Sequence, residues 1–398
     1  MAGLFEGDVC KDSIRFLHLS DTHFGVHYAL KPRNLLRRAY SELFFQKVED
    51  VIREAISIHK VDFIIHSGDF FNRSKPSPEV LDRGVKPFQL AARKGIPVFI
   101  TPGNHERSKL PIGLLPFAID NINLFSEPCS CLFEKNGLTI KITGFPYVRY
   151  KARKNFSEIL SKAWNNSSTH KSRKYDFSIL VVHQLLAGSC IEGYTFCKGY
   201  NVVPMLQVLR KFNYVACGHV HRFQFLYERG KPLLKSTNGF FRVIQDYGAG
   251  SWHFDDECCS CSSFPNPVIA YAGSLERVSI KEGNEPKGYI IGELNPSPAG
   301  QGTVNVKYRF HELSAVKMIY KTWNLSKSSM KNYINQTLEE MYDFHSTCKS
   351  KREKPQQGLT GIIEIRIRGN GLHNNAFMDH FKQEAKRLRF YLKFRVYA

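Results

Sequence analysis

What the sequence lacks limits where this 398-residue protein can work. No stretch reaches the roughly eighteen consecutive apolar residues that a membrane-spanning helix needs. Residues 1–13 contain no apolar segment like that of a signal peptide. We therefore expect a cytoplasmic protein without a membrane partner, associated with the nucleoid if it is bacterial. Internal repeats and low-complexity segments are also missing.

Acidic residues are scarce. The chain has 36 Asp and Glu against 56 Lys and Arg, which gives a formal net charge of +20. So large an excess predicts a polyanionic partner, either a nucleic acid or an acidic protein. Several basic residues follow apolar runs, and among them we regard Arg33, Arg149 and Lys151 as candidate substrate contacts.

The ten cysteines form only two clusters, Cys129–Cys131 and Cys258–Cys261. In a reducing compartment such residues stay as thiols. A zinc site built from both clusters is one hypothesis, but the one-residue gaps are tighter than the usual spacing of zinc ligands. Cysteine-rich surface loops are the favoured interpretation.

Polar motifs follow five strand-like apolar runs, at residues 14–19, 61–65, 96–100, 177–182 and 214–216. Open α/β sheets bind ligands at the carboxyl ends of their strands, and residues i and i+2 of an extended segment point to the same side. One Asp-x-His pair is weak, but the ordered set predicts a two-metal phosphoesterase. The motifs are Asp21-Thr22-His23, Gly68-Asp69, Gly103-Asn104-His105-Glu106, His183 and Gly218-His219-Val220-His221.

Coordination chemistry assigns roles within this set. Two divalent cations about 3.5–4 Å apart need a bridging carboxylate, for which Asp69 is the candidate. Asp21, His23 and His221 complete one metal, and Asn104, His183 and His219 complete the other. His105 is not needed as a ligand, so it is the candidate catalytic residue that donates a hydrogen bond to the phosphate or a proton to the leaving oxygen.

Apolar runs alternate with segments of helical period at residues 38–58, 79–94, 155–164 and 203–211, which predicts a layered α/β core. Residues 287–294 and 304–310 should form a hairpin that completes this core, within a first domain of residues 1–312. Residues 231–267 lack periodicity and are interpreted as an irregular insertion. Residues 313–398 predict a small β-α-β-α-β domain with helices near 327–344 and 375–387.

Two further segments carry a resemblance to known proteins. They are Gly68-Asp69-Phe70-Phe71 with Lys75-Pro76-Ser77-Pro78, and residues 271–277 with Lys287-Gly288-Tyr289. Together with the metal motifs, they resemble the calcineurin-like metallophosphoesterases, and within them the SbcD-type nuclease subunits of double-strand-break repair. The resemblance implies an α/β/β/α core with a DNA-binding C-terminal cap. It also implies two manganese ions and a 3′–5′ DNA exonuclease that could cut hairpins or ends as an endonuclease.

The resemblance also implies partners. Family members form dimers through helices that correspond here to residues 79–94 and 110–119; the apolar candidates are Phe88, Leu90, Leu114, Leu115 and Phe117, with ordinary core packing as the alternative. An SbcC-type ATPase is a further implied partner. Because the sequence ends after the cap without the family's tail for that ATPase, this partnership stays open.

The residues also leave other functions open. Asn72 replaces a histidine that many family members have three residues after the bridging aspartate. Either exonuclease activity is weakened, or another group such as His105 or His27 substitutes for that histidine. Asn72 and Arg73 are candidate substrate contacts, and Arg73 also suits a phosphatase of the same superfamily. A DNA-binding scaffold with a silent metal site is the third hypothesis.

Overall fold

The structure is a computed structural model. It describes residues 13–26, 35–106, 120–166, 174–191, 194–204, 212–226, 251–253, 268–283, 285–296, 304–325, 329–350, 361–368 and 376–397. The chain divides into two compact units. Unit 1 consists of residues 1–26, 45–275 and 286–313, and unit 2 of residues 27–44, 276–285 and 314–398. The sequence pattern did not indicate that two segments from before residue 313 would belong to unit 2.

A seven-stranded sheet forms one half of unit 1, in the order β14-β17-β16-β1-β2-β3-β4. Its parallel part consists of β1 (Ile14–Leu19), β2 (Phe63–His66), β3 (Val98–Ile100) and β4 (Ile122–Leu124). β16 (Lys287–Pro296) runs antiparallel to β1 and to β17 (Val304–Leu313), as the predicted hairpin requires. β14 (Ser251–His253) pairs with β17 at the edge.

A six-stranded sheet forms the other half, in the order β13-β15-β12-β7-β6-β5. Its members are β13 (Gln224–Leu226), β15 (Val268–Tyr271), β12 (Tyr214–Gly218), β7 (Phe177–His183), β6 (Leu138–Gly144) and β5 (Cys129–Lys135). The sequence prediction omitted the β5–β6 hairpin. Its signal is Asn136-Gly137, whose φ angles of 51° and 76° are those of a two-residue type I′ turn.

Two short two-stranded pairs lie outside these sheets. β8 (Leu185–Leu186) pairs with β11 (Val202–Val203), and β9 (Cys190–Ile191) pairs with β10 (Tyr194–Thr195). Val203 was predicted to begin a helix over residues 203–211. It belongs instead to a strand, because its backbone pairs with Leu186, and residues 205–211 lie outside the described part of the chain.

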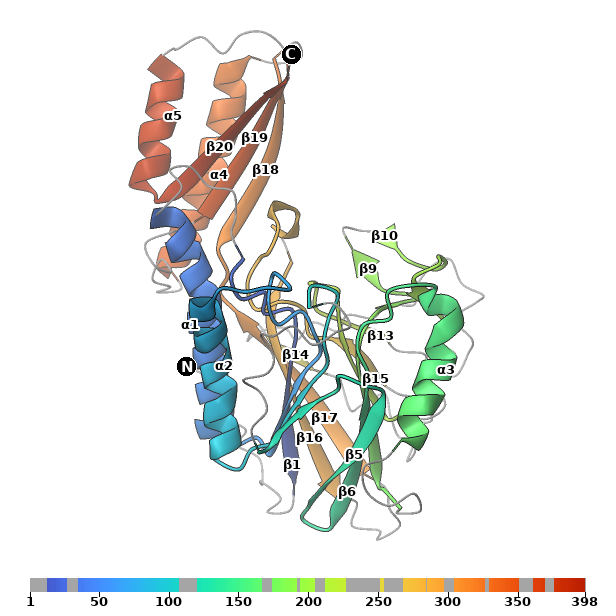
Figure 1. The fold of residues 1–398 in the computed structure, drawn as a ribbon. Coiled ribbons are helices and arrows are strands. Elements are labelled where there is room, and N and C mark those ends of the chain that lie inside the picture. Colours follow the sequence, from blue (N-terminus) through green and yellow to red (C-terminus); the bar gives the residue numbers. More distant parts are fainter. Residues whose placement is uncertain are drawn as a thin grey trace. The chain divides into compact units, whose positions relative to one another are not determined.

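Helices cover the outer faces of the two sheets (Figure 1). α1 (Leu35–Ser57), from Phe45 onward, and α2 (Pro78–Arg93) lie against the seven-stranded sheet, and α3 (Ala152–Asn165) lies against the six-stranded sheet. A third cluster of buried residues fills the space between the sheets, where the rings of Phe16 and Phe63 stack at 5.2 Å. These layers confirm the α/β/β/α core.

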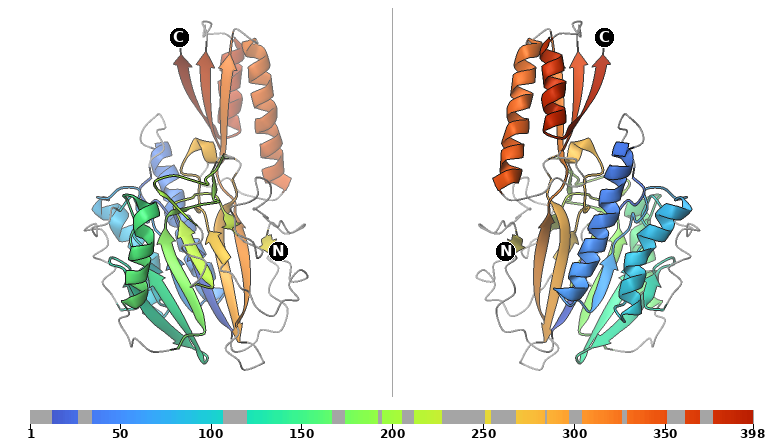
Figure 2. Two further views of the ribbon diagram at one scale, coloured as in Figure 1. Left: turned by 90° about the vertical axis from the view of Figure 1, so that its right-hand side faces the viewer. Right: turned by 90° about the vertical axis from the view of Figure 1, so that its left-hand side faces the viewer.

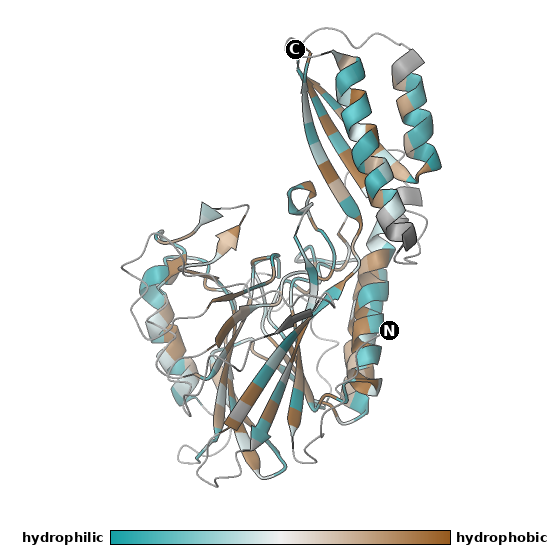
Figure 3. Cartoon of the chain, turned by 180° about the vertical axis from the view of Figure 1, so that it is seen from behind, coloured by the Kyte–Doolittle hydropathy of each residue, from teal (hydrophilic) through white to brown (hydrophobic). Residues whose placement is uncertain are grey.

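Unit 2 contains the expected β-α-β-α-β order. β18 (Lys317–Asn324), β19 (Gly361–Arg368) and β20 (Phe390–Tyr397) form a parallel sheet. α4 (Met330–Ser350) and α5 (Ala376–Arg387) lie together on one side of it (Figure 2), where Trp323, Ile365 and Phe381 form the core. The outer sides of these helices are mostly hydrophilic (Figure 3), as expected of amphipathic helices.

Two interpretations of the sequence are corrected by burial. Cys129 and Cys131 lie on β5 and pack against the core between the sheets, because side chains two residues apart on a strand share a face. They are not in a surface loop. Burial raises the pKa of the Cys131 thiol to about 12, which disfavours the thiolate that zinc needs. Cys258–Cys261 and most of the insertion 231–267 lie outside the described residues.

Phe88 was a candidate for a dimer surface, but it is completely buried and packs on Phe70 with ring centroids 4.9 Å apart. Leu90, on the same helix, exposes 51% of its surface. Residues 110–119, with Leu114, Leu115 and Phe117, lie outside the described residues. None of the helices that the structure describes has the length and apolarity to cross a membrane.

Candidate metal centre

The candidate ligands lie at the carboxyl ends of strands from both sheets, His183 as the last residue of β7 and the others on the loops that follow their strands. Asp21, His23, Asp69 and His219 all have left-handed backbones, with φ of 52°, 43°, 52° and 85°. Residues other than glycine adopt this conformation at a cost, and such strain gathers at functional sites. The first two loops are bonded together, because the Asp21 N–H donates to the Gly68 carbonyl and the His23 N–H to the Asp69 carbonyl, each at 3.0 Å.

Asp21, His23, Asp69 and His221 form one cluster, in which one ligand atom from each residue lies within 4.8 Å of the others. The Nε2 atoms of His23 and His221 are 3.1 Å apart. His221 Nε2 lies 3.6 Å from Asp21 Oδ1, and His23 Nε2 lies 3.7 Å from Asp69 Oδ2. These are the four residues that the sequence assigned to the first metal.

Asn104, His183 and His219 form a second cluster beside Asp69. Asn104 Oδ1 lies 3.0 Å from His183 Nε2 and 2.8 Å from His219 Nδ1. His183 Nε2 is 3.4 Å from Asp69 Oδ2. Asp69 therefore stands between the two clusters, in the position expected of a bridging carboxylate.

Three positions around the centre have room only for glycine, because a side chain there would overlap the candidate ligands or the backbone beside them. A Cβ atom at Gly68 would overlap the His183 ring, and one at Gly218 would overlap both that ring and the Ser67 carbonyl. A Cβ atom at Gly103 would overlap Asp69. Gly68 also has a φ of +98°, which favours glycine independently of the available space.

Two buried contacts orient the ligands. His183 Nδ1 lies 2.8 Å from the Ser67 carbonyl, which requires the proton on Nδ1 and turns the Nε2 lone pair toward Asp69 and Asn104. The buried carboxylate of Glu106 accepts hydrogen bonds from the Phe71 and Gly103 N–H groups, both at 2.7 Å, and so joins the loops after β2 and β3.

The buried charges shift one another's ionisation. Burial alone would raise the pKa of Asp69, but the charges of His183, His23 and His105 hold it well below its usual range. Burial alone would lower the pKa of His183, yet Asp69 raises it to about 9. Burial raises the pKa of Asp21. Burial and, secondarily, the charge of Asp69 raise the pKa of Glu106 to about 8.

His105 lies beside the centre without joining either cluster. Its backbone N–H donates to Asp69 Oδ1 at 2.9 Å, and its Nδ1 is 2.8 Å from the Asn72 carbonyl. Its side chain is 36% exposed, and Nε2 lies 3.8 Å from Asp69 Oδ2. An imidazole held through Nδ1 in this way can present Nε2 to a substrate.

The donor set fits two divalent cations. Donors bound at about 2.1 Å around one cation lie roughly 3 to 4 Å from one another. The nitrogen and oxygen contacts within the two clusters range from 2.8 to 3.9 Å. Two carboxylates, four imidazoles and one amide oxygen are also the ligand types expected for divalent transition metals.

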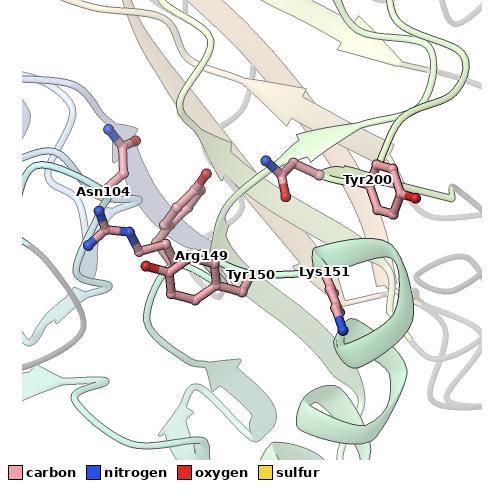
Figure 4. A pocket seen from close by; sticks show the side chains of 7 residues that line it. Asn104, Arg149, Tyr150, Lys151 and Tyr200 are labelled. Atoms are coloured by element: carbon pink, nitrogen blue, oxygen red, sulfur yellow. The ribbon is translucent and has the colours of Figure 1, made fainter.

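Two surface hollows meet at Asn104. One, of about 560 Å³, is lined by Asn72, Arg73, Ser74, Lys75, Asn104 and His105. The other, of about 660 Å³, is lined by Asn104, Tyr147, Arg149, Tyr150, Lys151, Tyr200 and Asn201 (Figure 4). Four predicted substrate contacts therefore lie next to the centre, and Arg33 is outside the described residues.

Sequence reasoning missed the aromatic part of these surroundings and the role of Glu106. The signal for the aromatic residues is Tyr147-Val148-Arg149-Tyr150, which follows β6 just as the metal motifs follow their strands. No comparable sequence signal marks Tyr200. It lies in the hollow only because the fold places it beside residues that are about 50 to 100 positions earlier in the chain. Glu106 belongs to the Gly103–Glu106 motif, but its bonds to two loops become visible only in the folded chain.

Comparison with known proteins agrees with this geometry. Residues 14–223 match the family model described as calcineurin-like phosphoesterase. Similar proteins named DNA double-strand break repair protein Mre11 occur in several archaea. That of Methanococcus maripaludis is 24% identical over 293 residues, covering 71% of this chain and 63% of the relative.

Two further relatives carry the same name. That of Thermoplasma acidophilum is 24% identical over 368 residues, covering 86% of this chain and 75% of the relative. That of Methanosarcina acetivorans is 34% identical over 284 residues, covering 70% of this chain and 36% of the relative. The chain spans about half to two thirds of the length of several such relatives.

The relatives confirm the resemblance to double-strand-break repair proteins that the motifs predicted. The matching family model covers more than half of the chain and includes both ligand clusters. The chain belongs to the calcineurin-like phosphoesterase family.

Proposed function

We propose that this protein is a two-metal-dependent DNA phosphodiesterase of double-strand-break repair. The observation that carries the proposal is the convergence of the seven candidate ligands, with the carboxylate of Asp69 between two sets of donors. The relatives named for double-strand break repair support DNA as the substrate. We further propose 3′–5′ exonuclease activity, with endonuclease activity at hairpins or ends.

When bound, two divalent cations, which we propose to be manganese, supply Lewis acidity and a water of lowered pKa for attack on phosphorus. The protein's own groups then orient the substrate and move protons. Arg73 and Lys75 attract the phosphodiester to the hollow beside Asn104. His105, fixed through Nδ1 and partly exposed, presents Nε2 to the leaving oxygen as a proton donor.

The charge of the molecule supports a nucleic acid as substrate. The net charge of +20 comes with basic residues in both hollows, Arg73 and Lys75 in one and Arg149 and Lys151 in the other. In unit 2, Arg366, Lys393 and Arg395 surround the buried carboxylate of Glu364 on the sheet face opposite the helices. We propose that unit 2 is the DNA-binding cap, and the first unit the nuclease domain.

A phosphatase is the second candidate, because Arg73 lines the hollow beside His105 and could hold a phosphomonoester. Incubating the protein and manganese with linear duplex DNA, or with a phosphopeptide, separates the two functions. Our proposal requires DNA cleavage. Turnover of the phosphopeptide with the DNA left intact would establish the phosphatase instead.

Two substitutions test the roles of the residues. Asp69→Ala should abolish DNA cleavage and lower the metal content measured by mass spectrometry, because both ligand sets lose a shared donor. His105→Ala should lower kcat by about 10² to 10⁴-fold, the usual contribution of a general acid, while metal content and DNA binding are retained. Full DNA processing by Asp69→Ala would refute the two-metal mechanism, whereas DNA binding without cleavage by the wild type would favour the scaffold with a silent metal site.

The partners are also proposals. We propose a homodimer formed through α2, where Leu90 offers an exposed apolar side chain, and an SbcC-type ATPase as a further partner in the cytoplasm. Sedimentation of the wild type and of Leu90→Lys tests the dimer. A single monomeric species for the wild type would refute it.

A further inference from the structure

The larger hollow beside the candidate metal centre contains groups that the proposed chemistry does not use. Its lining begins at Asn104, a candidate ligand, and continues through Tyr147 to Arg149, Tyr150 and Tyr200. The Tyr147 ring lies 5.5 Å from that of His219 and 6.0 Å from that of His183, measured between centroids. The hollow is therefore continuous with the place where phosphodiester cleavage is proposed to occur.

Two large aromatic side chains in this hollow face solvent. Tyr150 is 72% exposed and Tyr200 is 84% exposed, although an aromatic ring gains most by being covered. They come from different segments, and Figure 4 shows Tyr200 across the hollow from Asn104, Arg149 and Tyr150. An arrangement of exposed rings next to a phosphodiester centre offers stacking surfaces to a nucleobase.

The remaining polar groups of the hollow suit the backbone of a nucleic acid. Arg149 and Lys151 are exposed, and the Arg149 guanidinium lies 5.4 Å from the centroid of the Tyr150 ring. None of the seven lining residues is acidic. Cations interleaved with aromatic rings are typical of grooves that bind single strands, where rings take the bases and cations take the phosphates.

Hydrogen bonds anchor the backbone segments that carry the rings. The Tyr147 N–H donates to the Pro102 carbonyl at 3.0 Å, which joins this loop to the one that carries Asn104. The Arg153 N–H donates to the Tyr200 carbonyl at 3.1 Å, which joins the Tyr200 segment to the first turn of α3. The Asn155 side-chain amide also donates to the Tyr150 carbonyl at 3.2 Å, so both rings project from anchored backbone, which lowers the backbone entropy lost when a base stacks on them.

We propose that Tyr150 and Tyr200 stack an unpaired base of the DNA strand next to the phosphodiester that is cut. This inference rests on the proposed function and specifies its substrate. A paired base is stacked within its duplex, so only a frayed or single-stranded end can place a base on these rings. The enzyme should therefore process DNA whose end is unpaired faster than DNA with a fully paired blunt end.

The test compares ring-removing with ring-keeping variants. In EDTA, a single-stranded oligonucleotide containing 2-aminopurine should lose fluorescence on binding the wild type, Tyr150→Phe or Tyr200→Phe, because stacking quenches that base. Tyr150→Leu and Tyr200→Leu should bind with less quenching. Tyr194→Leu is the matched control, since Tyr194 is also exposed, at 64%, but does not line the hollow.

Activity gives the second readout. With manganese, the ratio of kcat/KM on single-stranded DNA to that on bis(p-nitrophenyl) phosphate should fall roughly 5- to 100-fold in each leucine variant, the range that stacking of one base supplies. The phenylalanine variants and Tyr194→Leu should keep the wild-type ratio. The small diester has no base, so it reports the metal centre alone.

Three results would overturn the inference: quenching that persists in Tyr150→Leu combined with Tyr200→Leu, a fall of the ratio as large in the phenylalanine variants, or a fall as large in Tyr194→Leu. Failure of the proposed function looks different. The wild type would then hydrolyse the small diester but cut no DNA, and the quenching experiment would still decide whether the rings bind a base. A phosphopeptide that displaces the oligonucleotide and is hydrolysed in its place would refute both.

Discussion

At Gly68, the candidate metal centre has no room for even one additional methyl group. We expect Gly68→Ala to lose metal binding, because the new methyl group would displace the His183 ring. Independently of this clash, alanine at the positive φ of residue 68 lowers the free energy of unfolding by about 1 to 2 kcal/mol. Metal titration by calorimetry and thermal unfolding measure the two effects separately.

Gly137→Ala is the control for this substitution. Gly137 also has a positive φ, of +76°, but a Cβ atom there would meet nothing within 4 Å. It should lower stability by about 1 to 2 kcal/mol and bind metal like the wild type. Equal metal affinities of the two alanine variants would contradict the steric explanation.

His18 makes stability depend on pH. It is completely buried between the Tyr214 hydroxyl and Ser67 Oγ, at 2.8 and 2.9 Å, and burial lowers its pKa from 6.5 to about 3. Between pH 6.5 and about 3, His18 binds a proton in the unfolded chain but not in the folded chain. The stability contributed by neutral His18 is therefore complete above pH 6.5 and is lost as the pH falls toward 3.

Urea unfolding of the metal-free protein between pH 7 and 4 checks this prediction. His18→Asn should be less stable at pH 7, because it leaves a cavity in the core. Its free energy of unfolding should then fall less steeply with decreasing pH than that of the wild type. The two slopes should differ by about 1.4 kcal/mol per pH unit. Parallel pH profiles would show that His18 is not neutral in the folded state.

At the scale of elements, Glu106 fixes the relative position of the loops after β2 and β3. Glu106→Ala would leave the N–H groups of Phe71 and Gly103 buried without an acceptor, at a cost of about 1 to 3 kcal/mol each. Because these loops carry Asp69 and Asn104, metal affinity should fall about 10- to 100-fold. Thermal unfolding and metal titration measure both losses.

Glu106→Gln should recover part of each loss, because its amide oxygen can still accept one of the two bonds. Glu158→Ala removes an exposed carboxylate from α3 and serves as the control. A metal affinity of Glu106→Ala equal to that of the control would show that the loops keep their positions without this carboxylate.

The elements themselves follow from the sequence pattern to different degrees. β1, β7 and β12 were predicted because each is a predominantly apolar run, and nearly all of their side chains are buried. β5 was missed although Cys129-Ser130-Cys131 alternates in the way typical of a half-buried strand, because the search for strands relied on continuous apolar runs. The strands β8 to β11 are two residues long each, and β8 also depends on pairing with the later β11, so they carry little local signal.

On the scale of the whole molecule, the excess positive charge should govern DNA affinity. In unit 2, Glu364 and Lys393 are in register, as are Arg366 and Arg395, so all four share one face of the sheet. The triple variant E364Q/K393Q/R395Q removes two positive charges and avoids leaving a buried carboxylate unpaired. We expect weaker DNA binding and a slope of log K against log salt that falls by about 1 for each phosphate that the protein no longer neutralises.

The control for this variant is E384Q/K382Q/R387Q, which removes the same charges from α5, where Lys382 and Arg387 are exposed and Glu384 is partly buried. Fluorescence anisotropy at several salt concentrations measures both. If the two variants weaken binding equally, only net charge matters and the sheet face is not a binding surface.

The sequence by itself determined the order of the motifs, the donor types of the candidate ligands and the layered α/β core, because strand periodicity and donor types are local properties. It also determined the β-α-β-α-β pattern of unit 2. Only the tertiary structure decided that Phe88 belongs to the core, that Glu106 joins two loops, and that Tyr150 and Tyr200 share a hollow with Asn104. These features arise from contacts between residues far apart in the chain, and spacing along a sequence does not encode such contacts.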